Sequence, residues 1–533
     1  MTSLVKTVDS FFSEWAKASS PGCAVAIMKD GDVIYKQGYG MANLEYGIPI
    51  TPQTIFPIAS VSKQFTAFAI ALLADRGKLS LDDDIRSYLP EMHDFGDVVT
   101  IRHLIHHTSG LREQTLLPIL AGERTDHITR IVDFKAMTFR QKGLNYKPGE
   151  RFLYSNTNYT LLGMIVARIS RQSLNDFCQE NIFKPLSMHN TLFYDEYEML
   201  VKNRAYSYRE DSEGKYKKWA LDTDTVGGTG IFTTIEDLAL WDQNFYDAKV
   251  GGQDVITQMH TKGLLNSGES ITYAFGLGVN TYKGLTVVEH SGGHAGFRSA
   301  FRRFPEPHFS VVILSNHGSV NTFELANKII DFYLADNLNN DEPEQPTSIE
   351  LSSKQLNQHI GFYYCSDIGS TIPIEMREGK LFVYFDAGYE LAALSETLFY
   401  VKASPEVKYH FEKMADGSRQ MIESVGRDKP TVYKLVSPEP MNCEQEAEYS
   451  GKYYSQELDV TYSILLQEDN LMLERPTHGR RQLTSVFVDG FIVLEADYLG
   501  TINLLFHRDT DDQVLGFKLS TYQARHIEFV KQN

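Results

Sequence analysis

Apolar and polar residues alternate near the start of the chain and then recur at helical spacing. The stretch GCAVAIMKDGDVIYKQGYG alternates on both sides of Asp30-Gly31, which predicts a β-hairpin. From Ser60 to Gly77 the apolar positions predict an amphipathic helix, through Phe65, Phe68, Ala69, Leu72 and Leu73. Lys63 lies in the first turn of this helix, where the helix dipole disfavours a cation. Residues that break a local rule tend to lie at functional sites, so Lys63 is a candidate for function.

Further strands are expected around residue 300. The stretches LTVVEHSGGHAGFRSAFRRFP and FSVVILSNHG each predict one strand, and a helix is expected over residues 321–334. A helix-rich middle separates these strands from the hairpin at the start of the chain. This order predicts an α+β domain, with an antiparallel sheet built from both ends of the segment and a helical region inserted between them.

The C-terminal part of the chain predicts strands and turns in two similar modules. Residues 335–348 (ADNLNNDEPEQPTS) are acidic and nearly free of large apolar residues, which indicates a linker. Residues 360–383 and 450–473 then match without a gap at an offset of 90, and each module has the many short strands of a small sandwich or an up-and-down barrel. We therefore expect an α+β domain at 1–338, a linker at 339–348, and all-β barrel-like modules at 349–438 and 443–533.

Composition and charge narrow the classes of function. The 533 residues are 42% hydrophobic and 23% charged, which is typical of a globular protein of two or three domains. The net charge of -18 argues against nucleic acid or an anionic membrane as a partner. The four cysteines have no CxxC spacing, so neither a zinc site nor a disulfide framework is expected from Cys23, Cys178, Cys365 and Cys443.

The first 22 residues, MTSLVKTVDSFFSEWAKASSPG, predict an amphipathic helix. The segment carries Asp9 and Glu14 and lacks the unbroken apolar core that a signal peptide needs. No stretch of the sequence approaches the apolar length of a membrane span. A cytoplasmic location is therefore expected, although a chain from which a signal peptide had been removed would look the same.

Ser60 and Lys63 form a Ser-x-x-Lys pair whose context sets it apart. The same spacing occurs at residues 3–6 and 212–215, but neither of those pairs opens an apolar helix. Residues three apart share a helix face, and the exposed N–H groups of the first turn can hold an anion. A serine hydroxyl needs a base to become nucleophilic, and a lysine whose charged form is disfavoured can be that base. An N-cap serine followed by a lysine that reaches solvent is the alternative, and the pair alone does not exclude it.

Three stretches, PIASVSKQFTAFAI, GERFLYSNTNYTLLGMIV and VVEHSGGHAGFRS, together resemble the penicillin-recognising serine hydrolases. That family includes class C-type β-lactamases, DD-peptidases, and their esterase and D-aminopeptidase relatives. The resemblance covers about residues 21–334, and the sequence holds a single Tyr-x-Asn. The three motifs of the family match here in order, at Ser60 and Lys63, at Tyr154 and Asn156, and at His290 and Gly292.

The resemblance implies acyl transfer through an acyl-enzyme. Ser60 would attack a carbonyl carbon, and Lys63 and Tyr154 would share the general-base and general-acid work. Asn156 would hydrogen-bond to Lys63 or to the substrate amide. The sequence does not decide whether Lys63 or Tyr154 takes the serine proton, since coupled groups need not titrate separately.

The third motif bears on the oxyanion and on the substrate. The oxyanion would lie between the backbone N–H groups of Ser60 and Gly293, because Gly292 and Gly293 let a strand approach closely. A lysine in this motif gives a fixed charge for a substrate carboxylate, whereas His290 is expected to be only partly charged at neutral pH. This departure favours the D-aminopeptidase and esterase branches over efficient β-lactamases and carboxypeptidases.

Other polar residues are given structural interpretations. His103, His106 and His107 have helical spacing, but no HExxH is present and no carboxylate or cysteine stands at matching spacing. We therefore expect neither a metal nor another cofactor. His294 and Arg298, further along the third motif, are interpreted as exposed polar residues in preference to residues that line the cleft.

The three-part layout resembles that of D-aminopeptidases, in which a barrel loop restricts the active-site mouth to small substrates. The stretch ERPTHGRR, residues 474–481, is a candidate for such a loop or else a solvent-exposed hairpin tip. The first hypothesis is a D-aminopeptidase-like peptidase or amidase acting on small peptides or amides, and the sequence does not decide the chirality of the substrate. A carboxylesterase or weak β-lactamase with the same machinery, and a non-catalytic binding protein, are the alternatives. The sequence does not decide the oligomeric state, and a homodimer is compatible with it.

Overall fold

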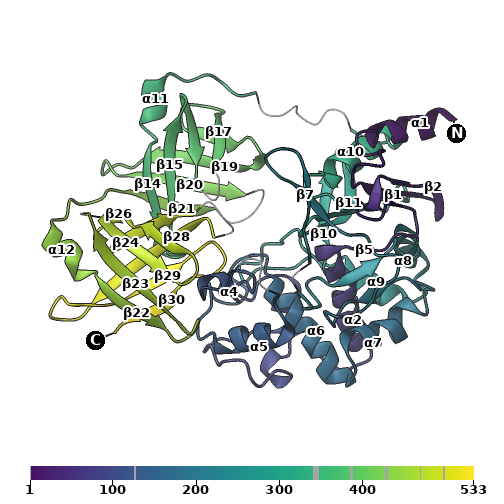
Figure 1. The fold of residues 1–533 in the computed structure, drawn as a ribbon, viewed down its shortest axis with the longest axis horizontal. Helices are drawn as coiled ribbons and strands as arrows, with labels where there is room; N and C mark the ends of the chain where they lie inside the picture. The colour runs from purple at the N-terminus through teal and green to yellow at the C-terminus, as the bar shows by residue number, and fades with distance from the viewer. Residues whose placement is uncertain are drawn as a thin grey trace.

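The chain folds into three lobes, each built around its own sheet (Figure 1). The first lobe combines a six-stranded sheet with helices, the second is a closed barrel, and the third is a nine-stranded sheet. The computed structural model describes residues 2–532 except 125–127, 222, 340–346, 385–387, 426–429, 469 and 496–498. Most of the predicted linker, residues 340–346, lies outside the described residues.

The sheet of the first lobe joins the two ends of that lobe. Its strand order is β10-β11-β12-β13-β1-β2, and β1 pairs with β13 in antiparallel register, with Val25 opposite Ile313. This confirms the prediction of an α+β fold whose sheet is built from both ends of the segment. The strands are β1 (Cys23–Lys29), β2 (Asp32–Tyr39), β10 (Gly278–Tyr282), β11 (Leu285–His294), β12 (Phe297–Phe304) and β13 (Phe309–Ser315).

Strand β1 is apolar from Cys23 to Met28 because helices cover both of its faces. Val25 packs with the helices at the two ends of the lobe, α1 (Thr2–Phe11) and α10 (Thr322–Tyr333). Ala26 points to the opposite face and packs in the core that contains the central helices. Buried strands of this kind lose the alternation of a half-exposed strand. The remaining helices are α2 (Lys63–Asp75), α3 (Ile101–Ile105), α4 (Leu116–Leu120), α5 (Ile131–Arg140), α6 (Asn156–Ser170), α7 (Leu174–Cys178), α8 (Ile235–Asp247) and α9 (Gly252–Met259).

Two local predictions hold and one is wrong. The hairpin at Asp30-Gly31 is confirmed, since Lys29 pairs with Asp32 across the turn. The helix expected over residues 321–334 is confirmed as α10. The stretch predicted to be one strand around residue 290 instead forms two strands, β11 and β12, joined by the two-residue turn Ala295-Gly296. The two small residues of this turn allow the chain to reverse direction. The apolar residues on both sides of the turn gave no sign of the reversal in the sequence.

Helix α2 corrects the prediction of an amphipathic helix. A 3-10 turn, Ala59–Ser62, precedes it, and every side chain from Lys63 to Leu73 is buried. The helix lies in the middle of the lobe against α6 and α9, so it has no solvent-facing side. The apolar positions mark only part of the buried surface of this helix. The polar side chains of Gln64 and Thr66 are buried too, because they donate hydrogen bonds to Val61 O and Gly227 O.

The two β modules repeat one another in detail. Tyr363 and Tyr453 occupy equivalent strand positions, and each donates its hydroxyl to the carbonyl of the residue four positions earlier. The first module is a closed up-and-down barrel with strands β14 (Gly361–Cys365), β15 (Ser370–Arg377), β16 (Lys380–Val383), β17 (Tyr389–Ala393), β18 (Leu398–Val401), β19 (Ser404–Lys413), β20 (Arg419–Val425) and β21 (Thr431–Val436).

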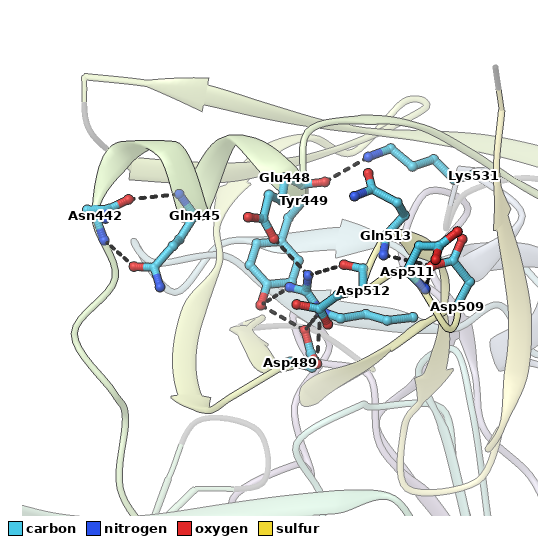
Figure 2. Close-up of polar contacts among 11 residues, drawn as sticks. Asn442, Gln445, Glu448, Tyr449, Asp489, Asp509, Asp511, Asp512, Gln513 and Lys531 are labelled. Atoms are coloured by element: carbon cyan, nitrogen blue, oxygen red, sulfur yellow. Dashed lines mark hydrogen bonds and ion pairs between the residues drawn. The ribbon is translucent and has the colours of Figure 1, made fainter.

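The last module is a nine-stranded meander whose two end strands, β25 and β26, are not paired with each other in the described sheet. Its strands are β22 (Gly451–Ser455), β23 (Val460–Gln467), β24 (Asn470–Arg475), β25 (Gly479–Gln482), β26 (Thr484–Phe487), β27 (Gly490–Leu494), β28 (Thr501–Arg508), β29 (Val514–Ser520) and β30 (Ile527–Lys531). A capping box formed by Asn442 and Gln445 begins helix α12 (Cys443–Glu448) (Figure 2). Lys531 of β30 attaches the helix to the sheet by donating its Nζ to Glu448 O. Arg508 adds an ion pair to the Glu448 carboxylate.

The last module shares a core with the first lobe. Leu117 and Leu120 of α4 pack into the same apolar cluster as Ile464 and Phe529 of the module. Beside this cluster Arg112 Nη1 pairs with Glu457 Oε2 at 2.5 Å, and both side chains are buried.

Among the described residues, no helix is long and apolar enough to cross a membrane.

We expect the buried Arg112–Glu457 pair to hold the last module against the first lobe. Arg112→Ala should lower the free energy of unfolding by about 3–5 kcal/mol, because it leaves the Glu457 carboxylate buried and unpaired. Arg140→Ala is the matched control, since the exposed Arg140–Asp459 pair at 3.1 Å should contribute about 1 kcal/mol or less. Urea unfolding followed by circular dichroism measures both, and equal losses would contradict the assignment.

Candidate active site

Ser60 lies on a turn that two strands hold in place. The residue before it, Ala59, has a φ of 48°, a left-handed conformation that is uncommon for a residue with a Cβ. Ser299 of β12 donates its hydroxyl to Ile58 O at 2.8 Å. A Cβ at Gly292 of β11 would overlap Ile58 O and Ser299 Oγ, so only glycine permits this close packing. The hairpin of β11 and β12 therefore sets the position of Ser60.

Lys63 is completely buried and lies against Ser60. Its Nζ is 2.7 Å from Asn156 Oδ1, 2.7 Å from Gly228 O and 3.2 Å from Ser60 Oγ. Burial lowers the pKa of Lys63 to about 7, and the negative charge of Glu113 works in the opposite direction. A neutral amine has two N–H donors, which the two carbonyl oxygens accept. Its lone pair then faces Ser60 Oγ, as a base for the serine proton requires.

Glu113 fixes the orientation of Asn156 at the start of α6. Glu113 Oε2 accepts from the Asn156 backbone N at 2.6 Å, and Oε1 accepts from Asn156 Nδ2 at 3.0 Å. Because the carboxylate needs a donor, Oδ1 of the amide must face Lys63. The helix N-terminus also favours a negative charge here. Sequence analysis did not single out Glu113, since it belongs to none of the three motifs and its contact lies 43 residues away in the chain.

Tyr154 lies beside Lys63, whose Nζ is 4.7 Å from the centroid of the phenol ring. The Tyr154 hydroxyl is buried, and among the described residues it has no hydrogen-bond partner of good geometry. Burial raises the pKa of Tyr154 above its usual range, and the nearby Ser60 hydroxyl lowers it in part. The phenol is therefore protonated at neutral pH and has a proton to give.

His290 is neutral, which corrects the expectation that it is partly charged. Its Nδ1 is 2.6 Å from Ser291 O, and Tyr273 OH lies 3.0 Å from its Nε2. Burial, with a smaller contribution from the nearby charge of Lys63, lowers the pKa of His290 to about 3. The third motif thus offers no positive charge to a substrate carboxylate at neutral pH.

The backbone of β11 has a free edge beside Ser60. Strand β10 pairs with β11 only as far as Glu289, and no described strand pairs with residues 290–294 on that side. The two-residue turn makes His294 and Phe297 a hydrogen-bonded pair, and alternation along the ladder then directs the Gly293 N–H outward. This is the direction an oxyanion donor needs. A Cβ at Gly293 would meet only ordinary contacts, so the close approach explains Gly292 but not Gly293.

A cavity of about 450 Å³ opens beside Ser60, Asn156 and Gly293. His294 and Arg298 also line it, so their interpretation as exposed residues outside the cleft is wrong. The turn between β11 and β12 brings them back over the site, which one uninterrupted strand would not do. The apolar part of the lining comes from α4 and α5, with Leu116, Ile119, Phe134 and Met137.

The three clustered histidines each have a separate structural partner. His103 accepts from Thr100 N at the start of α3, and His106 Nδ1 lies 3.3 Å from Tyr273 O. His107 accepts from Ser155 N at 3.1 Å and packs its ring against Tyr154. Within the described parts of the chain, no three histidine, cysteine, aspartate or glutamate residues are grouped to hold a metal ion. His107 thus supports the loop that carries Tyr154.

The last module reaches the site at two places. In the stretch 474–481, Thr477 donates to Gly122 O, and His478 Nε2 lies 3.0 Å from the carbonyl oxygen of Glu123, a residue that lines the cavity. This hairpin is therefore not a free, solvent-exposed tip. Elsewhere Gln523 donates its side-chain amide to Tyr154 O at 2.6 Å and accepts from the Glu113 backbone N at 3.0 Å. One residue of the last module thus ties together the segments of Tyr154 and Glu113, which sequence analysis did not anticipate.

Residues 8–334 match the model of the Beta-lactamase family, and the chain belongs to this family. It is similar to a D-aminopeptidase of Gluconobacter oxydans, at 25% identity over 83% of this chain and 81% of that protein. It is also similar to a D-aminopeptidase of Brucella anthropi, at 24% identity over 96% of this chain and 95% of that one. Among solved structures, an octameric penicillin-binding protein homologue from Pyrococcus abyssi aligns with a TM-score of 0.57 and 25% identity, over 81% of this chain and 99% of that one.

These likenesses confirm the predicted fold and the predicted class of enzyme. The chain is a serine hydrolase of the Beta-lactamase family followed by two barrel-like sheets. The roles of the individual side chains follow from the geometry around Ser60 and are developed below.

The negative charge of Glu113 raises the pKa of Lys63 and should therefore shift the acid limb of the pH–activity profile. In the wild type, kcat/KM for a 4-nitrophenyl ester should fall as the pH drops below about 7, because Lys63 then becomes protonated. Glu113 raises the pKa of Lys63, so Glu113→Gln should move this acid limb to lower pH, in addition to any loss of rate. Glu123→Gln, at another carboxylate of the same cavity, should leave the limb in place. An unmoved limb in Glu113→Gln would show that Lys63 is not the titrating base.

Proposed function

We propose that this chain is a peptidase or amidase that hydrolyses small peptides or amides through an acyl-enzyme on Ser60. The observation that carries the proposal is the arrangement of Lys63, whose two donors are taken by Asn156 Oδ1 and Gly228 O while its lone pair faces Ser60 Oγ. The D-aminopeptidases similar to the chain support an amide substrate.

In the acylation step Ser60 Oγ forms a bond to the substrate carbonyl carbon and passes its proton to neutral Lys63. The carbonyl oxygen gains the negative charge and accepts hydrogen bonds from the backbone N–H groups of Ser60 and Gly293. Asn156 keeps the amine of Lys63 in place throughout, because Glu113 holds the amide in one orientation. The geometry thus favours Lys63 over Tyr154 as the group that takes the serine proton.

Collapse of the tetrahedral intermediate breaks the bond between carbon and nitrogen and needs a proton for the leaving amine. Tyr154 is suited to give that proton, because its hydroxyl is protonated and has no competing acceptor of good geometry among the described residues. The phenolate would regain a proton from the Lys63 ammonium beside it. Water then attacks the acyl-enzyme by the same steps in reverse.

The third motif favours a substrate without a carboxylate next to the scissile bond, because His290 is neutral. Arg124 and Arg298 also line the cavity, and Arg298 Nη1 already donates to Ala295 O at 2.8 Å and to Phe297 O at 2.7 Å. An aminopeptidase or amidase substrate fits this site better than a β-lactam or a peptide that must be held by its C-terminus. The apolar wall from α4 and α5 suits the acyl chain of an ester, so carboxylesterase activity is the second candidate.

Ser60 should be the residue that reacts with an active-site probe. Treatment with a fluorophosphonate should add one adduct to the wild type, seen by intact mass, and none to Ser60→Ala. Ser62→Ala is the matched control: Ser62 Oγ accepts from Ile231 N at 3.0 Å and is buried, so its loss should leave the adduct in place. An adduct on Ser60→Ala would move the nucleophile elsewhere.

The substrate class is tested by comparing an amide with an ester. D-alanine 4-nitroanilide should be hydrolysed by the wild type and not by Ser60→Ala, with L-alanine 4-nitroanilide as the chirality control. Release of nitroaniline gives kcat/KM directly, and 4-nitrophenyl butyrate gives the value for an ester. Hydrolysis of the ester without either anilide would contradict the amidase proposal and leave the carboxylesterase in its place.

A further inference from the structure

A second cavity, of about 500 Å³, lies where all three lobes meet. It shares no lining residue with the cavity beside Ser60. Residues of the first lobe, of the barrel and of the last module all contribute to it, which is consistent with the way the three lobes adjoin in Figure 1. Its volume lies in the range of sites for small organic ligands.

Arg525 of the last module lines this cavity and is only 5% exposed. Its Nε donates to Tyr522 O at 3.1 Å, and its backbone N donates to Asn145 Oδ1. Across the described residues, neither Nη1 nor Nη2 of Arg525 has a hydrogen-bond partner, and no carboxylate lies within 4.0 Å of it. A buried guanidinium is costly unless an anion accompanies it.

The other buried arginines of the described chain show what Arg525 lacks. Each of them has a carboxylate partner within 2.7 Å: Arg112 with Glu457, Arg302 with Glu289, Arg303 with Asp242 and Arg475 with Glu495. Arg525 is the exception, and it is the buried arginine that faces the junction cavity. The junction cavity therefore offers space beside Arg525 for an anion from solution to act as its counter-ion.

Glu423 of the barrel also lines the cavity, but it does not serve as the counter-ion of Arg525. Its two oxygens accept from Tyr409 OH at 2.9 Å and from Tyr433 OH at 3.1 Å. Burial raises the pKa of Glu423, and the charge of Arg525 lowers it in part. Glu150 and Arg151 also line the cavity, and Arg151 Nη2 lies 4.0 Å from Asp367 Oδ2. Among the described residues, none of these carboxylates forms an ion pair with Arg525.

Apart from several serine and threonine residues, most of the remaining lining is apolar or aromatic. Phe152 and Leu153 come from the first lobe, and Val401, Val407 and Tyr433 from the barrel. Tyr433 also belongs to the barrel core, so the cavity continues one end of the barrel interior. Closed eight-stranded barrels have an interior wide enough for side chains or one small ligand.

We propose that the junction cavity binds a small organic carboxylate with an aromatic or branched apolar body, its carboxylate held by the Nη atoms of Arg525. Planar guanidinium and carboxylate groups match in a bidentate geometry. The apolar body lies against Phe152, Val401 and Val407. This site is independent of the acyl-transfer site and needs no catalytic activity for its detection.

Isothermal titration of the full chain with benzoate, 3-phenylpropionate and octanoate tests the proposal. At least one of the three should bind with a stoichiometry of one, and the corresponding neutral alcohol should bind at least tenfold more weakly. Arg525→Gln should weaken binding of that carboxylate at least tenfold. Arg298→Gln is the matched control, since it removes a guanidinium from the other cavity and should leave the binding unchanged.

A second variant separates loss of the site from disturbed docking of the lobes. Val407→Trp fills the cavity from the barrel side and leaves Arg525 in place, and it should also abolish binding while the thermal unfolding stays that of the wild type. Absence of binding by all three carboxylates would overturn the proposal. Equal binding by wild type and Arg525→Gln, or loss of binding only in Arg298→Gln, would overturn it as well.

Discussion

The burial of one lysine amine governs the architecture around the active site. Lys63 has no exposed surface, so its charged form is disfavoured and its pKa falls to about 7. A buried amine must still have its donors satisfied, and Asn156 Oδ1 and Gly228 O accept them. These two acceptors come from distant parts of the chain and leave the lone pair one direction, toward Ser60. The requirement to bury a neutral amine thus determines where the base points.

This arrangement extends outward in a chain of contacts that ends in the last module. Glu113 orients Asn156, and the Glu113 backbone N donates to Gln523 O. The same Gln523 donates to the carbonyl of Tyr154. The module therefore does more than cover the first lobe. It supports the two segments that carry Tyr154 and Glu113, and the buried pair of Arg112 and Glu457 fastens it there.

Much of the fold was predictable from sequence, because apolar patterns mark strands at both ends of the first lobe and because the two modules repeat one another in sequence. The complete burial of α2 was not predictable. The spacing of apolar residues shows which side of a helix is apolar, but it does not show how many other elements pack against the helix. The turn at Ala295-Gly296 was not predicted, because the strands on both sides of it form one continuous stretch of strand-like sequence. The motifs identified Ser60, Lys63, Tyr154 and Asn156, and the structure brings them together. Glu113 and Gln523 could not be found, because their roles depend on contacts between distant segments.

The neutrality of His290 has the same origin as the low pKa of Lys63. Both side chains are buried in one small volume, and the charge of Lys63 further lowers the pKa of His290. The pKa of His107, packed against Tyr154, is also lowered by burial and then by Lys63. Three nitrogen bases thus share a region in which a low dielectric tolerates at most one positive charge. Because that charge has to appear on Lys63 when Ser60 gives up its proton, it cannot also serve as a standing counter-ion for substrate. Lys63, His290 and His107 together therefore supply a base for Ser60 and no standing positive charge for a substrate carboxylate.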